Sequence, residues 1–112
     1  MRTINLEAGM PSSQDAMNTL NNRIYAERAT GAHCVKIIHG YGSTGRGGII
    51  RKECRRKLLE YKTRRVIKDT CPGEKFGPFS DEGRRLSAAC PEVRSDIDWG
   101  RDNPGITIVL FK

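Results

Sequence analysis

A histidine followed by a run of glycines is the most chemically suggestive feature of this sequence. His39 ends an apolar run, and five glycines lie within the next nine residues: Gly40, Gly42, Gly45, Gly47 and Gly48. Glycines let backbone N–H groups converge on a bulky anion, and histidine exchanges protons near neutral pH. Arg46 and Arg51 lie within and just after the run. The segment therefore predicts a site for a phosphate group.

Two common nucleotide-binding motifs do not fit this segment. A P-loop ends in Gly-Lys-Ser or Gly-Lys-Thr, and that ending does not occur here. The dinucleotide fingerprint needs an early Gly-x-Gly-x-x-Gly and an acidic residue after the next strand. The chain, at 112 residues, is also short for either fold. Hydrolysis of nucleoside triphosphates is therefore not expected.

The distribution of charge also favours an anionic partner. The net charge is +7, and ten of the 20 lysines and arginines lie between Arg46 and Lys68, with only two acidic residues among them. From Asp69 to Asp102 there are eight acidic and five basic residues. A basic run can be a merely solvated helix face, but its excess of cations favours contact with phosphates.

The elements that must position these residues follow from hydrophobic periodicity. Apolar, β-branched runs predict strands, and apolar residues at four-residue spacing predict helices. The expected order is β-α-β-α-β-(α)-β, an α/β fold in one domain over residues 1–112, whose first two strands form a parallel βαβ unit. The expected strands are residues 3–6, about 33–39, a start near Val66, and 106–111; the helices are 12–30, 50–64 and a short one after Ser80. His39 then lies at the carboxyl end of a parallel strand, where ligands bind in such folds.

Three segments resemble a known family. His39-Gly40-Tyr41-Gly42 with Gly48-Ile49-Ile50-Arg51 is similar to the His-Gly-x-Gly loop and following Gly-x-Leu-Arg of Smr (small MutS-related) domains. The ending NPGITIVLF resembles the last strand of that family, and INLEAGMPSSQDAM stands where the family has Leu-Asp-Leu-His-Gly and a helix. The resemblance implies a two-layer α/β sandwich like the C-terminal domain of bacterial translation initiation factor 3. It also implies binding of DNA or RNA and, in several members, endonuclease activity.

The resemblance places an active site at the first strand and the glycine loop. The family's aspartate position is Asn5 here, and its first histidine falls near Glu7 or Ala8. We therefore take His39 and Glu7 as candidate catalytic residues, with Glu7 able to act as a base or to bind a cation. The connection at about 72–103 is longer than usual for the family. The candidate nucleic-acid contacts are Gly40, Tyr41, Gly42, Arg46, Gly47, Gly48, Arg51, Lys52 and Arg55.

Three hypotheses remain open from the sequence. The first is a nucleic-acid-binding domain that cleaves phosphodiesters with weak sequence specificity. The second is a degenerate, non-catalytic binder of DNA or RNA. The third is a protein-interaction module, for example for a ribosomal partner, in which Asp96 and Asp98 dock a basic surface.

Cofactors and location are expected from composition. The four cysteines form no Cys-x-x-Cys pair, so we expect reduced structural thiols, a structural role for His33 and no metal site. No cofactor is expected, although a divalent cation is compatible with cleavage. No apolar stretch reaches the length of a membrane span, and MRTINLEAGM has no signal-peptide core. We therefore expect a cytoplasmic protein with no membrane partner.

Overall fold

One four-stranded sheet runs through the molecule in a computed structural model that describes residues 1–41 and 46–112, without the side chains of residues 46 and 47. The strands are β1 (Arg2–Asn5), β2 (Cys34–Ile38), β3 (Asp69–Pro72) and β4 (Ile106–Leu110), in the order β1-β2-β4-β3. β1 and β2 are parallel, whereas β4 is antiparallel to both β2 and β3. The expected parallel βαβ unit is confirmed.

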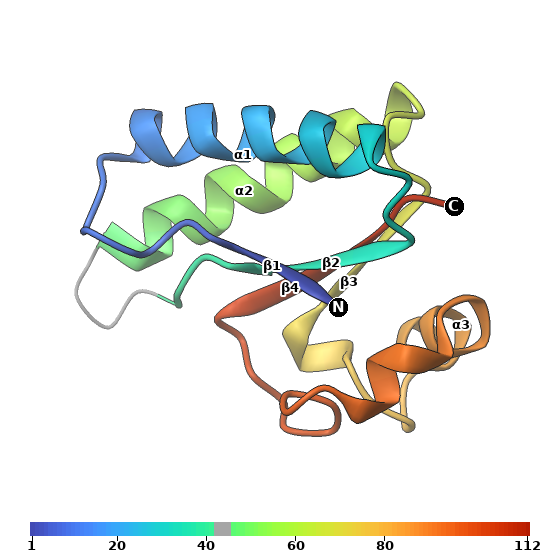
Figure 1. Cartoon of the computed structure of the whole chain (residues 1–112). Helices are drawn as coiled ribbons and strands as arrows, with labels where there is room; N and C mark the ends of the chain where they lie inside the picture. Colours follow the sequence, from blue (N-terminus) through green and yellow to red (C-terminus); the bar gives the residue numbers. More distant parts are fainter. Residues whose placement is uncertain (42–45) are drawn as a thin grey trace.

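Two long helices cover one face of this sheet (Figure 1). They are α1 (Ser13–Ala29) and α2 (Arg46–Thr63). The Ser12 hydroxyl accepts a hydrogen bond from the Asp15 N–H at 3.1 Å and so caps α1. The apolar stripes of both helices are buried against the strands in a first core: Ile4, Leu6, Ala16, Leu20, Ile24, Val35, Ile37, Ile50, Cys54, Leu58, Tyr61, Val66, Ile67 and Val109.

The long connection between β3 and β4 covers the opposite face (Figure 1). It contains α3 (Asp81–Ala89) and two 3-10 turns, η1 (Gly73–Lys75) and η2 (Pro91–Ser95). Their apolar residues form a second core with the other side of the sheet: Cys34, Cys71, Phe76, Leu86, Cys90, Val93, Ile106, Ile108 and Leu110. β2 and β4 are therefore buried on both faces, which explains their almost wholly apolar composition.

The sequence predicted the fold class and the element order correctly, and two boundaries differ. α2 begins at Arg46, whereas the sequence favoured a start near Ile50. β3 begins at Asp69, whereas the sequence favoured a start near Val66. The backbone N–H groups of Val66 and Ile67 bond to the Tyr61 carbonyl oxygen, so this stretch closes the end of α2 before the strand begins. Among the described residues, no helix is long and apolar enough to cross a membrane.

Candidate functional site

The carboxyl ends of β1 and β2 bring Glu7 beside Gly40. The Asn5 side-chain oxygen accepts hydrogen bonds from the N–H groups of Glu7 and Ala8, at 2.9 and 3.0 Å, and this turn ends β1. Gly40 has φ +75°, and a Cβ there would lie 3.0 Å from the Glu7 carboxyl carbon. The backbone conformation thus favours a glycine, and a larger residue would also displace the exposed Glu7 carboxylate slightly. Glu7 is exposed and lies against Gly40, the residue that follows buried His39 in the chain.

His39 is wholly buried, and both of its ring nitrogens have partners. Nδ1 lies 2.7 Å from the Gly40 carbonyl oxygen, which can only accept, so Nδ1 carries the proton. Nε2 therefore accepts from the Thr107 hydroxyl at 2.9 Å. Desolvation lowers the pKa of His39 to about 4, so the ring is neutral at pH 7. A direct contact between this ring and a phosphate would require one of these hydrogen bonds to open.

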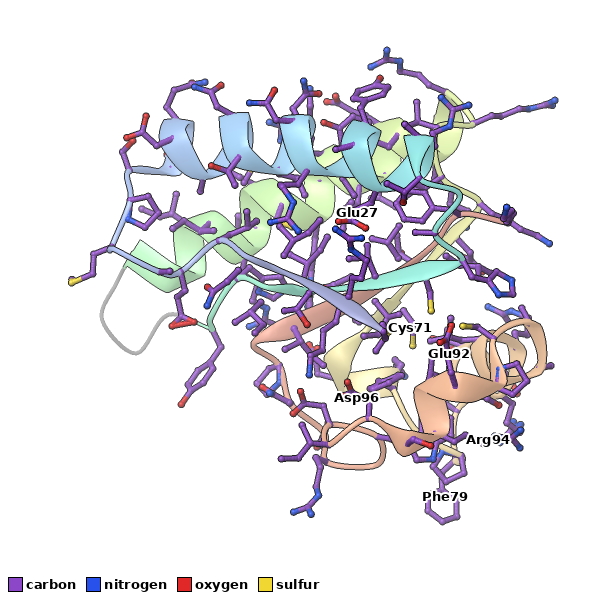
Figure 2. The ribbon with its side chains drawn as sticks, in the orientation of Figure 1. Glu27, Cys71, Phe79, Glu92, Arg94 and Asp96 are labelled. Carbon is purple, nitrogen blue, oxygen red and sulfur yellow. The ribbon has the colours of Figure 1, made fainter. Side chains whose placement is uncertain are left out.

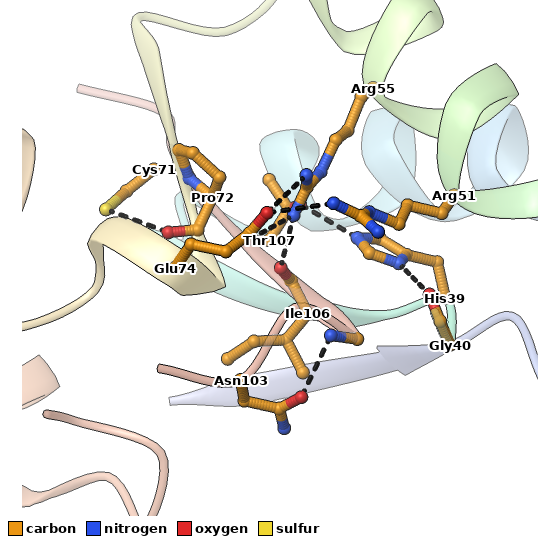
Figure 3. Close-up of polar contacts among 11 residues, drawn as sticks. His39, Gly40, Arg51, Arg55, Cys71, Pro72, Glu74, Asn103, Ile106 and Thr107 are labelled. Atoms are coloured by element: carbon orange, nitrogen blue, oxygen red, sulfur yellow. Dashed lines mark hydrogen bonds and ion pairs between the residues drawn. The ribbon is translucent and has the colours of Figure 1, made fainter. Parts of the chain in front are cut away.

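Arg55 connects this histidine to an acidic residue, Glu74, in the turn that follows the edge strand β3 (Figure 3). Its Nε donates to Thr107 Oγ1 at 3.2 Å, and its Nη2 donates to the Ile106 carbonyl oxygen at 3.3 Å. Both terminal nitrogens also bond to the Glu74 carboxylate, at 3.0 and 2.6 Å. Arg51 Nη2 reaches the same carboxylate at 2.9 Å. A continuous chain of hydrogen bonds therefore runs from Glu74 through Arg55 and Thr107 to His39.

Sequence reasoning did not find Glu74. Hydrogen bonds from Arg55 hold the pKa of Glu74 down to about 2, so its charge persists at neutral pH. The preceding Gly73 fixes its position, because a Cβ at Gly73 would lie only 1.7 Å from the Asn103 carbonyl oxygen. The turn signal at Pro72-Gly73 was visible in the sequence, but the pairing with α2 was not.

Several other cations of α2 are also paired. Arg56 binds Glu53 and Glu60, at 2.7 and 2.9 Å, and Lys62 binds Asp69 at 3.0 Å. Residues 46–68 thus offer fewer available cations than the count of ten in that segment suggested. Lys52 is exposed and forms no ion pair within the described part of the chain.

The remaining predicted contacts lie around the same edge. The Tyr41 side chain is 58% exposed, and its ring lies beside Gly105. The N–H groups of His39 and Gly40 both donate to the Gly105 carbonyl oxygen at 3.0 Å. The sequence suggested that the N–H of Gly40 donates to a phosphate, but in the structure this N–H already donates to Gly105. Gly47 and Gly48 lie in the first turn of α2, Gly42 lies outside the described residues, and the side chain of Arg46 is likewise not described.

Asp96 and Asp98, which the protein-interaction hypothesis used as docking residues, have an internal partner. Lys36 Nζ lies 3.0 Å from Asp96 Oδ1 and 2.8 Å from Asp98 Oδ2. Lys36 is only 7% exposed in the middle of β2. The two aspartates thus neutralise a buried lysine, and this accounts for part of the acidic composition of the 72–103 connection.

Comparison with known proteins decides the family. The Smr domain model matches residues 8–75, which include the glycine loop, α2 and Glu74. This chain belongs to the Smr domain family. In a comparison with solved structures, this Smr domain matches the Smr domain of Thermus thermophilus MutS2 with a TM-score of 0.62 and 16% identity, over 100% of this chain and 99% of that one. That likeness concerns the fold alone, and a comparison with curated proteins finds no match.

The limits of the family match also bear on the site. The matched region begins just after Glu7 and ends just after Glu74. His39 and the candidate contacts on α2 are within the matched region of this Smr domain, whereas Glu7, Thr107 and the whole of α3 are outside it. The site therefore combines matched residues with partners from the two ends of the chain.

Proposed function

We propose that this Smr domain binds DNA or RNA along the edge that holds Tyr41, after the end of β2, and the first half of α2. The observation that carries the proposal is the position of Arg51 and Lys52 in the second turn of α2, directly after a first turn that contains no acidic residue. The positive end of the helix dipole points toward the same edge. A phosphate placed there meets two cations and a helix N-terminus together.

The residues of this edge differ in what they can contribute. Arg51 uses only Nη2 for Glu74 among the described interactions, so its other nitrogens can donate to a phosphate. Lys52 provides an exposed ammonium group. Tyr41, exposed beside the loop, is suited to stack on a base. None of these groups reads a base edge through a fixed pair of hydrogen bonds, so we expect weak sequence specificity.

Binding is tested by fluorescence anisotropy with labelled single-stranded RNA and duplex DNA across a salt series. Lys52→Ala should weaken binding and reduce the salt slope by about 0.7 for a single strand or about 0.9 for a duplex, the loss of one phosphate contact. The matched control is Lys68→Ala, because Lys68 is equally exposed and precedes β3 at the far end of the sheet. Equal effects of both variants, or no binding by the unmodified chain at low salt, would overturn the proposal.

Phosphodiester cleavage is a second candidate function, favoured by the contact between Glu7 and the His39-Gly40 turn. Glu7 faces solvent and can accept a proton from water or hold a divalent cation. Neutral His39 acts here by holding Thr107 and the turn in place, and it would take part in proton transfer only if its bond to Thr107 opens. A binder without cleavage is the alternative.

Cleavage is tested on the same labelled strands with Glu7→Gln and His39→Ala. In a nuclease, both variants lose cleavage by more than about tenfold while the affinity for the strand changes little. Glu60→Gln, which removes a carboxylate near the C-terminal end of α2, serves as the control. If the unmodified chain binds but does not cut, with or without Mg²⁺ or Mn²⁺, the domain is a binder only.

A further inference from the structure

Four side chains of the types that bind zinc gather at the end of β2 opposite His39. Cys34 Sγ lies 2.7 Å from Cys90 Sγ. Glu92 Oε1 lies 2.9 Å from Cys90 Sγ and 3.6 Å from Cys34 Sγ. A ring nitrogen of His33 lies within 4.8 Å of the Cys90 sulfur and of a Glu92 carboxylate oxygen. The cluster thus contains one nitrogen, two sulfurs and one oxygen.

The fold explains why these residues meet although 56 positions separate the two cysteines. His33 and Cys34 stand at the start of β2, and Cys34 faces the second core. Cys90 ends α3, where its N–H donates to the Leu86 carbonyl oxygen at 2.8 Å, and η2 then places Glu92 beside it. Figure 2 shows Glu92 next to sulfur atoms between the sheet and α3. Two short sequence pairs, His-Cys and Cys-x-Glu, are thereby brought together.

We propose that His33, Cys34, Cys90 and Glu92 bind a single Zn²⁺ ion. Zinc prefers four tetrahedral ligands of this kind, with Zn–S distances of about 2.3 Å and Zn–N or Zn–O distances of about 2.0 Å. Two sulfurs on one zinc stand about 3.8 Å apart by this geometry. The two Sγ atoms therefore separate by about 1 Å when the ion enters, a movement within reach of a side-chain rotation.

Proton release accompanies this binding. Burial raises the pKa of Cys34 and of Cys90, so both groups are thiols at neutral pH in the absence of metal. Each S–H bond breaks as a Zn–S bond forms, and two protons pass to solvent. The Glu92 carboxylate, whose pKa is lowered chiefly by the hydrogen bond from Cys90, is already charged. The bound ion thus faces two thiolates, one carboxylate and one neutral imidazole.

The consequence of such a site is structural. Both cysteines are buried, whereas His33 and Glu92 are exposed, so the ion enters from the solvent side and is then closed off by four protein ligands. A site with no open position is typical of structural rather than catalytic zinc. The ion would clamp the end of α3 to the start of β2 and hold the 72–103 connection on the second face of the sheet.

The first test is a zinc titration of the whole chain against a chromophoric chelator. The titration uses the chain without a polyhistidine tag. The N-terminal amino group is close enough for its charge to act on Cys34 and Glu92, so a tag attached there would compete for the metal. The chain is kept reduced with a phosphine. We expect one equivalent of Zn²⁺ to bind, and Co²⁺ in its place to give the absorption of a tetrahedral thiolate site. Zinc should raise Tm, and EDTA should reverse the rise.

Variants at the exposed ligands keep the test independent of folding. His33→Ala and Glu92→Gln should each weaken zinc binding by more than about tenfold, whereas Glu53→Gln should not change it. Cys90→Ser should abolish the thiolate absorption of cobalt. Absence of stoichiometric binding, or equal affinity in all variants, would overturn the proposal. A purified chain two hydrogens lighter, with Cys34 and Cys90 in one disulfide-linked peptide, would overturn it as well.

Discussion

Replacing Glu74 by glutamine should make the domain bind nucleic acid more tightly. In the folded chain Glu74 neutralises Arg51 and Arg55, two of the cations that the proposed interface offers to phosphates. The substitution keeps the size of the side chain, but one accepting oxygen becomes an NH2 group that cannot accept from either arginine. It raises the formal charge of this three-residue group from +1 to +2.

The magnitude follows from the contacts of each arginine. Arg55 donates to Thr107, Ile106 and Glu74 from all three of its nitrogens, so the carboxylate keeps it from a phosphate. Releasing it adds about one phosphate contact, which steepens the salt slope by about 0.7 for a single strand or about 0.9 for a duplex. Repulsion between two unit charges about 4 Å apart in water is about 1 kcal/mol. Its removal predicts about fivefold tighter binding at low salt.

The assay compares Glu74→Gln with the unmodified chain by fluorescence anisotropy at several salt concentrations. Glu60→Gln is the matched control, because it changes net charge equally and removes the carboxylate that Arg56 and Lys57 share near the other end of α2, although Arg56 keeps its bond to Glu53. A folded Glu74→Gln that binds no better than Glu60→Gln, with an unchanged salt slope, would refute the reasoning. Arg51 and Arg55 would then be structural and would lie off the nucleic-acid surface.

Three further predictions concern stability and are checked by urea unfolding. The pKa of buried His39 is about 4, below its ordinary 6.5, so the unfolded chain takes up a proton first as the pH falls. The free energy of unfolding should therefore be at its full value above about pH 6.5 and fall by up to about 3 kcal/mol as the pH drops to about 4. The variant His39→Gln should not show this loss. Lys36→Met should lower the free energy of unfolding by about 3 kcal/mol, because it leaves Asp96 and Asp98 without a cation between them. Replacing both aspartates by asparagine in the same variant should recover part of that loss. Gly73→Ala should lower the free energy of unfolding by about 2 kcal/mol, since the added methyl group would overlap the Asn103 carbonyl oxygen. An unchanged stability of Gly73→Ala would contradict this prediction, and an unchanged pH dependence in His39→Gln would contradict the one for His39.

The helices and strands were predictable because their hydrophobic patterns are strong. Apolar residues at positions 16, 20 and 24 and at 50, 54, 58 and 61 are buried as their spacing predicted. The placement of β4 between β2 and β3 was not predictable, because chain order does not specify which strands pair. The role of the 72–103 connection was not visible either, since its few apolar residues become a core only against the second face of the sheet.

The candidate site was predictable in its chemistry and less so in its connections. The loop and the basic helix placed His39, Arg51 and Arg55 near one another, as the structure has them. The partners that set their state come from distant positions: Glu74 lies 19 residues beyond Arg55, and Thr107 lies 68 beyond His39. Burial and tertiary hydrogen bonds decide whether a histidine is charged and whether an arginine is available to bind a phosphate. The spacing of residues along the sequence predicts neither.

The place of β4 in the sheet has a consequence for how the chain is made. β4 is the last strand in sequence order, yet it is a central strand and joins β3 to the β1–β2 pair. Until residues 106–110 have left the ribosome, β2 has one unpaired edge, β3 has no partner strand, and both cores lack one wall. The helices can form earlier, but the sheet closes in one late, long-range step that joins Cys34 to Leu110. Any pause in synthesis before that strand leaves apolar strand edges exposed to pairing with other chains.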